Sequence, residues 1–317
     1  MSQMKLGAVL WSQATDWEGF LTAARSVDRL GYDSIWTWDH LYAIFGEPLQ
    51  PIVEGYTALA GLAMGTERAE IGLLVGANTF RNPGIVAKSM VTIDHMSGGR
   101  AILGLGGAWF GPEHAAFGID FGTGFGQRLD WMDEATEAIR SLLDGKTVTS
   151  GGEGRYSFRD LRLDPLPARD RMPIMIGGSG EKKTLRTVAK YADQWNAFGS
   201  PETLAGKDAV LRRHCEDVGR NHEEIERTVG AKIVIRESEA EARRILEGLM
   251  EHNRTPMSSI ADDHTFWVGK ADEVTERLLA YKQIGFHTLL AEMPAPYDEE
   301  TMERLIGVVK PAVDSAS

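Results

Sequence analysis

Cysteine is almost absent from this sequence, since Cys215 is the only one in 317 residues. An internal disulfide is therefore excluded. No run of 18 apolar residues occurs, and the first residues lack the charged segment and long apolar segment that are typical of a signal peptide. We expect a cytoplasmic, soluble protein that has no membrane partner.

Positive charge is scarce relative to negative charge. The chain has 34 Lys and Arg residues against 46 Asp and Glu residues, which gives a formal net charge of -12. No block of Lys and Arg interrupts this acidity. Nucleic acid is therefore not expected as a partner, because phosphate backbones are bound by clustered positive charge.

Several motifs of common enzyme classes are also missing. The Gly-x-Gly-x-x-Gly fingerprint of doubly wound dinucleotide-binding sheets fails at its third glycine, both after residues 104–106 and after residues 122–124. No two histidines are spaced i, i+4, and Gly-x-Ser-x-Gly does not occur. We therefore expect neither a metal site nor a serine nucleophile.

The sequence contains instead eight short apolar runs that are rich in β-forming residues, most of them continuous rather than alternating in polarity. Such runs are typical of parallel strands that are covered on both faces. Helical patterns separate them, and no Gly/Ser-rich or Pro-rich linker divides the chain. The runs span residues 5–11, 34–38, 70–76, 100–106, 172–178, 194–199, 231–236 and 288–293. They predict a single α/β domain over residues 1–317, folded as a (β/α)8 barrel.

Three segments are longer than the loops of a minimal barrel. Residues 107–126 and 251–269 predict insertions after strands 4 and 7, and residues 147–163 predict a hairpin before strand 5 with its turn at 151–154. Long ordered loops in barrels are often functional. The polar insertion 251–269 has no clear period, so it is interpreted either as a lid or as a plain loop.

Tryptophans follow three of the predicted strands. Trp11, Trp38 and Trp109 lie at strand ends, where a (β/α)8 barrel carries its reactive groups. Their indoles predict the wall of a substrate pocket for a flat ligand, although each could instead plug the barrel. Their clustering at strand ends favours the pocket.

Asp39 and His40 follow strand 2 and are candidate catalytic residues. A carboxylate beside an imidazole suits acid/base chemistry, with the carboxylate orienting the ring. The alternative is a structural hydrogen-bonded pair, which is the commoner role for such residues. The sequence alone leaves both open.

The turn Gly177-Gly178-Ser179-Gly180 follows strand 5 and is a candidate phosphate site. Glycines let backbone amides approach an anion, and Ser179 is expected to cap the helix that follows. Lys182 and Lys183 would add positive charge nearby. An ordinary glycine-rich turn is the alternative. The position of these four residues at a strand end favours a phosphate site.

Five segments resemble the luciferase-like monooxygenase superfamily, and most closely its branch that uses the deazaflavin coenzyme F420. The resemblance covers nearly the whole chain. The segments are D-S-I-W-T-W-D-H-L (33–41), N-T-F-R-N-P-G-I-V-A-K (78–88), H-M-S-G-G-R-A-I-L-G-L-G (95–106), P-E-H-A-A-F-G-I (112–119) and P-I-M-I-G-G-S-G (173–180). The resemblance implies a flavin or deazaflavin at the carboxyl ends of the barrel strands, with F420 as the expected cofactor and FMN as the alternative.

The resemblance also assigns residues to the cofactor. It implies that Asp39 and His40 lie beside the ring and that a non-prolyl cis peptide lies behind it, at Leu74-Val75 or Val75-Gly76. The remaining cofactor residues that we expect are Thr79, Gly106, Gly107, Trp109, Gly177, Gly178, Ser179 and Gly180.

One departure from the family pattern concerns the proton donor. Sugar-phosphate dehydrogenases of this branch have a glutamate after strand 4, where this chain has Trp109, and Glu113 follows four residues later. The resemblance therefore does not imply a sugar phosphate, and Glu113 is expected only as a pocket residue.

Three functions remain open from the sequence. The expected one is hydride transfer between F420 and a small organic substrate, with His40 exchanging a proton while Asp39 orients it. An FMN-dependent two-component monooxygenase and a non-catalytic flavin-binding protein are the alternatives. A homodimer is a candidate assembly, because family members often pair.

Overall fold

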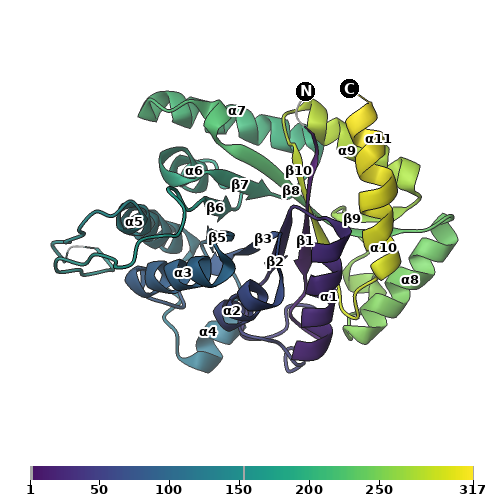
Figure 1. Ribbon diagram of the computed structural model, residues 1–317, viewed down its shortest axis with the longest axis horizontal. Helices are drawn as coiled ribbons and strands as arrows, with labels where there is room; N and C mark the ends of the chain where they lie inside the picture. Colours follow the sequence, from purple (N-terminus) through teal and green to yellow (C-terminus); the bar gives the residue numbers. More distant parts are fainter. Residues whose placement is uncertain (1–2, 153, 317) are drawn as a thin grey trace.

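A closed barrel of eight parallel strands forms the centre of the computed structural model, which describes residues 3–152 and 154–316 (Figure 1). The strands follow the order β10-β1-β2-β3-β5-β6-β7-β8, and pairing of β8 with β10 closes the ring. They are β1 (Lys5–Leu10), β2 (Ser34–Thr37), β3 (Glu70–Leu73), β5 (Ala101–Gly106), β6 (Ile174–Gly177), β7 (Gln194–Ala197), β8 (Glu226–Ile235) and β10 (Thr288–Met293). Each of the eight predicted runs supplies one of them, so the barrel prediction is confirmed.

Helices surround the barrel on its outside (Figure 1). They are α1 (Trp17–Leu30), α2 (Gly55–Gly65), α3 (Pro83–Ser97), α4 (Gly111–Phe117), α5 (Phe125–Leu143), α6 (Thr184–Tyr191), α7 (Pro201–Val218), α8 (Glu239–His252), α9 (Ala271–Gln283), α10 (Glu299–Arg304) and α11 (Lys310–Ser315), with the short 3-10 helices η1 (His222–Glu224) and η2 (Met257–Ser259) and the π-helical segment η3 (Leu305–Val309). Within the described ranges, no helix has the length and apolarity needed to cross a bilayer.

Side chains of alternating strand residues fill the inside of the barrel. Val9, Trp36, Ile102, Met175 and Leu290 belong to one buried cluster, whereas their neighbours Ala8, Ile35, Leu103, Ile174 and Leu289 belong to the cluster that the helices cover. This alternation follows from the two-residue period of a strand. The packed interior closes the barrel below its mouth, so a ligand can enter only at the end where the chain leaves the strands.

A backbone irregularity interrupts the third barrel strand. β3 ends at Leu73, the peptide bond Leu74-Val75 is cis, and the chain then forms β4 (Gly76–Ala77), which pairs with β5. The cis bond lies at one of the two positions that the resemblance implied. We call residues 74–77 the bulge.

Val75 of the bulge explains why glycines are needed on the neighbouring strands. A Cβ atom on Gly106 would lie 2.6 Å from Val75 Cγ2, and one on Gly177 would lie 3.0 Å from the Val75 methyl groups. A Cβ atom on Gly104 would overlap the carbonyl oxygen of Leu73. These glycines therefore make room for the bulge itself.

The three long segments differ in how well they match expectation. Residues 107–126 contain α4, and an antiparallel bridge between Val148 and Leu161 supports the expected hairpin, whose turn includes Glu153, a residue outside the described ranges. The expectation of a loop over 251–269 is wrong in part. It contains η2 and a further strand, β9 (Phe266–Gly269), which pairs with the end of β8 outside the barrel and packs Phe266 and Trp267 on opposite faces against two different buried clusters.

We expect Gly104→Ala to lower the free energy of unfolding by about 2–3 kcal/mol, because the added methyl group meets backbone that cannot move without shifting the bulge. Gly206→Ala is the control. A Cβ atom there has no neighbour within 4 Å, and the residue lies inside α7, so this variant should gain about 0.5–1 kcal/mol. Urea unfolding measures both, and equal effects would contradict the proposed clash.

Candidate active site

A cavity of about 380 Å³ opens at the carboxyl ends of the barrel strands. Its volume lies within the range of roughly 300–1,000 Å³ that is usual for small-molecule sites. Its lining includes residues on or just after six of the eight barrel strands, together with the bulge that follows β3. They are Trp38, Asp39, His40, Ile44, Phe45, Leu74, Val75, Gly76, Ala77, Gly106, Gly107, Ala108, Trp109, Glu113, Phe125, Gly177, Gly178, Asn196, Phe198, Lys232 and Glu292.

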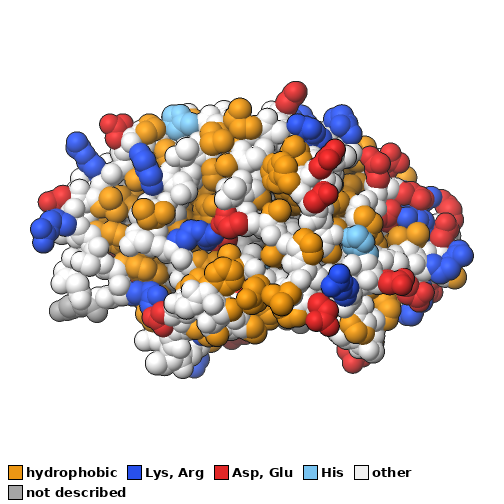
Figure 2. All heavy atoms as spheres, turned by 90° about the horizontal axis from the view of Figure 1, so that it is seen from below, with side chains coloured by type: hydrophobic (Ala, Val, Ile, Leu, Met, Phe, Trp, Pro, Cys, Tyr) orange, Lys and Arg blue, Asp and Glu red, His pale blue; other side chains and the backbone are white. Residues whose placement is uncertain are grey.

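The end of the molecule seen from below in Figure 1 is shown in Figure 2, where hydrophobic side chains gather near the centre and charged ones lie mainly toward the edges. Trp109 and Phe125, which both line the cavity, are 60% and 52% exposed although both are large and apolar. Exposed aromatic side chains beside a cavity are characteristic of ligand sites.

His40 and Glu113 form a pair within this cavity. His40 Nδ1 lies 2.9 Å from Glu113 Oε1, while Glu113 Oε2 accepts hydrogen bonds from the amides of Leu41 at 2.8 Å and Tyr42 at 3.4 Å. The Glu113 side chain is buried, and its oxygens act as acceptors. We infer that His40 Nδ1 donates, which leaves Nε2 without a partner in the described part of the chain.

Aromatic rings fix the His40 imidazole from several sides. The ring of Trp109 meets it edge to face with the centroids 5.7 Å apart, and Phe110 does so at 6.1 Å. Trp38 lies 6.3 Å away in a similar orientation. The imidazole is therefore held in one position inside a largely apolar wall.

The prediction that Asp39 orients His40 is wrong. Asp39 is buried, and both of its oxygens bind the guanidinium of Arg81, at 2.7 Å and 3.0 Å. Its Oδ2 also accepts a hydrogen bond from the Ala77 amide at 2.9 Å. Consecutive residues after a strand point to different sides, so Asp39 holds the bulge while His40 faces Glu113.

Arg81 also contacts two further side chains, Glu54 and Tyr56. It forms an ion pair with Glu54, and its guanidinium lies 4.4 Å from the centre of the Tyr56 ring. Burial raises the pKa of Asp39, and the Arg81 charge counteracts this effect. No local sequence pattern indicates this pairing, because 42 residues separate the two partners.

Four predicted site residues do not line the cavity, namely Trp11, Thr79, Ser179 and Gly180. Trp11 is completely buried behind the wall, where it stacks on Phe45 at 4.3 Å and lies 4.8 Å from Trp38. Thr79 is also buried, and its hydroxyl binds His114 Nε2 at 2.6 Å. Trp11 is therefore a plug that supports the wall, and Thr79 has a structural partner.

The Gly177–Gly180 turn is partly committed to the fold. Gly178 donates its amide to Asn196 O at 3.0 Å and has a φ of +116°, a conformation that favours glycine. The expectation that Ser179 caps the helix is wrong, since α6 begins at Thr184 and has no side-chain cap. Among the described residues, no group accepts a hydrogen bond from the amides of Ser179 and Gly180, so both remain available to an anion.

The lysine expected near this turn is occupied elsewhere. Lys183 Nζ binds Asp130 at 2.6 Å and the carbonyl oxygen of Gly126 at 3.0 Å. It therefore ties the turn to α5 and supplies less free positive charge than the sequence suggested.

Uncharged amide side chains hold a segment over the cavity. Gln13 Oε1 accepts hydrogen bonds from the amides of Ile44 and Phe45, and Gln13 Nε2 donates to Asn253 Oδ1 at 3.1 Å. Gln50 Nε2 donates to the carbonyl oxygens of Phe45 and Asn253. We call Gln13, Gln50 and Asn253 the amide clasp, and it keeps Ile44 and Phe45 in the cavity lining.

Two charged residues in the lining, Lys232 on β8 and Glu292 on β10, were not predicted from the sequence. Both are buried, and burial raises the pKa of Glu292. A signal for them existed, because each is a single charge within an otherwise apolar strand segment, A-K-I-V-I and L-L-A-E-M. Such a charge is costly unless it has a partner or a function.

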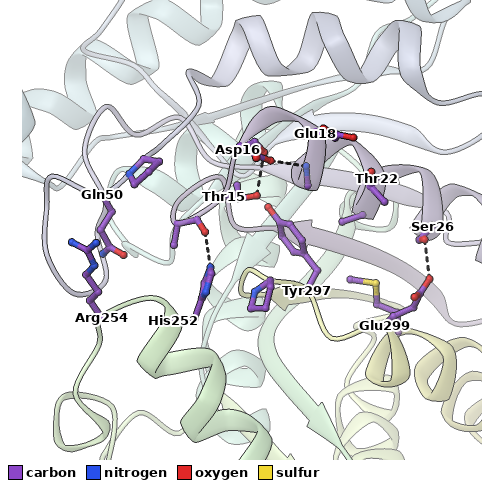
Figure 3. A pocket seen from close by; sticks show the side chains of 16 residues that line it. Thr15, Asp16, Glu18, Thr22, Ser26, Gln50, His252, Arg254, Tyr297 and Glu299 are labelled. Carbon is purple, nitrogen blue, oxygen red and sulfur yellow. Dashed lines mark hydrogen bonds between the residues drawn. The ribbon is translucent and has the colours of Figure 1, made fainter.

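A second, larger hollow of about 750 Å³ lies beside the first half of α1 (Figure 3). Several of its polar groups already bind one another. Asp16 caps α1 through the Gly19 amide, His252 Nε2 donates to the Ala14 carbonyl, and Ser26 donates to Glu299. We place the chemistry in the smaller cavity, where His40, Lys232 and Glu292 converge on one space.

Fold and site together define a (β/α)8-barrel protein with an aromatic-walled small-molecule site at its mouth. Residues 4–288 match the model of the luciferase-like monooxygenase family. The chain belongs to this family.

One relative by sequence matches about half of this chain. Pyrimidine monooxygenase RutA of Escherichia coli K12 is 32% identical over 176 residues, which cover 53% of this chain and 44% of the relative. This chain thus spans less than half the length of that protein.

Solved structures of similar shape contain either cofactor. An F420-dependent secondary alcohol dehydrogenase, in complex with an F420-acetone adduct, superimposes with a TM-score of 0.82 at 19% identity, covering 98% of this chain and 99% of its own. The oxygenating constituent of 3,6-diketocamphane monooxygenase from Pseudomonas putida, in complex with FMN, gives 0.74 at 15% identity, with 98% and 99% covered. At these identities the likeness shows the fold alone.

We expect Arg81→Met to lower the free energy of unfolding by about 3–5 kcal/mol at pH 7, because it leaves Asp39 buried without its counter-charge. Burial raises the pKa of Asp39, so protonation as the pH falls should relieve the unpaired charge. The loss should therefore shrink at pH 5. Urea unfolding at both pH values measures this effect.

Arg304→Met is the control for this prediction, because Arg304 pairs with Glu237 and Glu300 at the surface. It should cost less than about 1 kcal/mol at either pH. If Arg81→Met were as mild as this control, Asp39 would not depend on Arg81.

Proposed function

We propose that this protein is an oxidoreductase that transfers a hydride between the deazaflavin coenzyme F420 and a small organic substrate. His40 carries the proposal, because Glu113 holds its Nδ1 at 2.9 Å and leaves Nε2 free beside the cavity. A fixed imidazole of this kind can take a proton from a substrate hydroxyl or return one.

The cavity fits a flat redox ring with a phosphate tail. One side consists of backbone and small residues, namely the bulge together with Gly106, Gly107 and Gly177, so a planar group can approach closely. Trp38, Trp109 and Phe125 supply apolar surface. The unpaired amides of Ser179 and Gly180 suit the phosphate.

When bound, the deazaflavin would supply the hydride chemistry, and the protein would supply position and proton transfer. Glu113 fixes the tautomer of His40 so that Nε2 holds or releases the proton at the substrate. Trp109, whose ring packs against that of His40, would limit the access of water to this atom once a ligand fills the cavity. Asp39 acts at a distance from the proton, by fixing the bulge through the Ala77 amide.

A monooxygenase that uses FMN supplied by a partner reductase is the second candidate. The identity of 32% to a pyrimidine monooxygenase favours it. The cavity has the same fit for either ring, so the two proposals differ in the cofactor that is retained and in the need for oxygen.

Titration of the purified protein with F420 and with FMN, followed by difference absorbance, separates these candidates. We expect saturable binding of F420 with a dissociation constant at least about 10-fold lower than that of FMN. Tighter binding of FMN would favour the monooxygenase. Tight F420 binding without hydride transfer to any of a panel of alcohols and activated alkenes would indicate a protein that only binds the cofactor.

We expect His40→Ala to lower turnover about 100-fold or more while the dissociation constant of the cofactor changes less than about threefold, because the imidazole moves a proton and does not hold the ring. Stopped-flow reduction of F420 and the same absorbance titration give the two values. His214→Ala is the control, since His214 lies on α7 and binds the Glu181 carbonyl outside the cavity. Unchanged turnover in His40→Ala would remove His40 from the mechanism.

A further inference from the structure

Lys232 and Glu292 lie side by side in the cavity lining. They are paired residues in the parallel register of β8 and β10, so their side chains leave neighbouring strands on the same face. Adjacent strands are about 4.8 Å apart, which places a hydrogen-bond donor next to an acceptor. Neither residue is needed for the proton transfer proposed for His40.

Glu292 has spare hydrogen-bonding capacity. The residue is only 4% exposed, and its Oε2 accepts a hydrogen bond from Trp11 Nε1 at 2.9 Å. In the described part of the chain, no donor binds Oε1. A buried carboxyl oxygen that lines a cavity and lacks a protein partner is an acceptor available to a ligand.

Lys232 is held in place without using its partner on β10. Its Nζ donates to Thr265 Oγ1 at 2.8 Å and forms an ion pair with Asp263 at 3.4 Å. The rings of Phe45, Phe198 and Phe266 lie 5.2–5.8 Å from Nζ. An ammonium group has three hydrogens, so one remains for a group in the cavity.

We propose that Lys232 and Glu292 together bind a neutral amide group of the substrate. The carbonyl oxygen of the amide accepts a hydrogen bond from Lys232 Nζ, and its neighbouring N–H donates to Glu292 Oε1. This inference rests on the proposed function, because it takes the barrel mouth to be the place where the substrate lies.

The arrangement of charges selects a neutral group. A carboxylate would satisfy Lys232 but offers no hydrogen to Glu292 Oε1, and an ammonium group would satisfy Glu292 but offers no acceptor to Lys232, so neither charged group serves both side chains. A planar amide presents an acceptor and a donor on adjacent atoms, and its flat faces suit the aromatic walls. A carboxyl oxygen of Glu292 accepts the N–H whether or not the group carries a proton.

Two bicyclic probes that differ in one atom test this inference. Isoquinolin-1(2H)-one is a lactam, and isocoumarin replaces its N–H with a ring oxygen. Calorimetric titrations of the full chain, with and without saturating F420, measure both affinities. We expect wild type to bind the lactam about 10-fold more tightly than the lactone, since the lactone puts an acceptor against Glu292 Oε1.

The two cavity residues should respond differently. Glu292→Gln keeps an acceptor for Trp11 but presents an NH₂ group to the cavity, so the lactam preference should fall below about twofold. Lys232→Met removes the donor that serves both carbonyl groups, so both probes should weaken about 10-fold while the preference persists. A lactam preference that is absent in wild type, or unchanged in Glu292→Gln, would overturn the inference.

Control variants separate this outcome from failure of the proposed function. Lys5→Met and Glu226→Gln change the same residue types at the amino ends of the strands, where Lys5 pairs with Glu226, and should leave both affinities unaltered. Normal F420 binding without a lactam preference would overturn this inference alone. Absence of F420 binding would overturn the proposed function, and the cofactor-free titrations would still decide the role of Glu292.

Discussion

The buried carboxylate of Asp39 is the point on which the geometry of the mouth depends. It accepts two hydrogen bonds from Arg81 and one from the Ala77 amide, and thereby joins the end of β2 to the bulge after β3. The bulge in turn occupies the space left by Gly104 and Gly106 on β5 and by Gly177 on β6. One ion pair thus determines the wall shared by four barrel strands.

Asp39 and His40 therefore have different roles although they are adjacent in the sequence. Asp39 turns away from the cavity centre to hold the backbone, whereas His40 turns toward Glu113 on α4. The insertion after the fourth barrel strand therefore completes the site from outside the barrel. The family resemblance drew attention to residues 39 and 40 together, but their partners show that one shapes the wall and the other faces the ligand.

The barrel could be predicted from the sequence because its signal is local. Most of the strands are nearly continuous apolar runs, and such runs have few alternatives to a buried parallel sheet. The side-chain partners of the site residues could not be predicted in this way. Asp39 with Arg81 and His40 with Glu113 join positions 42 and 73 residues apart, and nothing within a strand specifies such a pairing. Ser179 failed as a cap because α6 starts five residues later, at Thr184.

The amide clasp above the mouth adds a property of a different kind. Its donors and acceptors are carboxamides and backbone groups, which do not titrate between acid and alkaline conditions and are hardly screened by salt. The segment with Ile44 and Phe45, which the amide clasp holds in the cavity lining, should therefore keep its conformation at a pH that weakens the Asp39–Arg81 ion pair. The segment over the cavity and the wall around Asp39 therefore differ in their response to acid, which can protonate the Asp39 carboxylate but not the carboxamides of Gln13, Gln50 and Asn253.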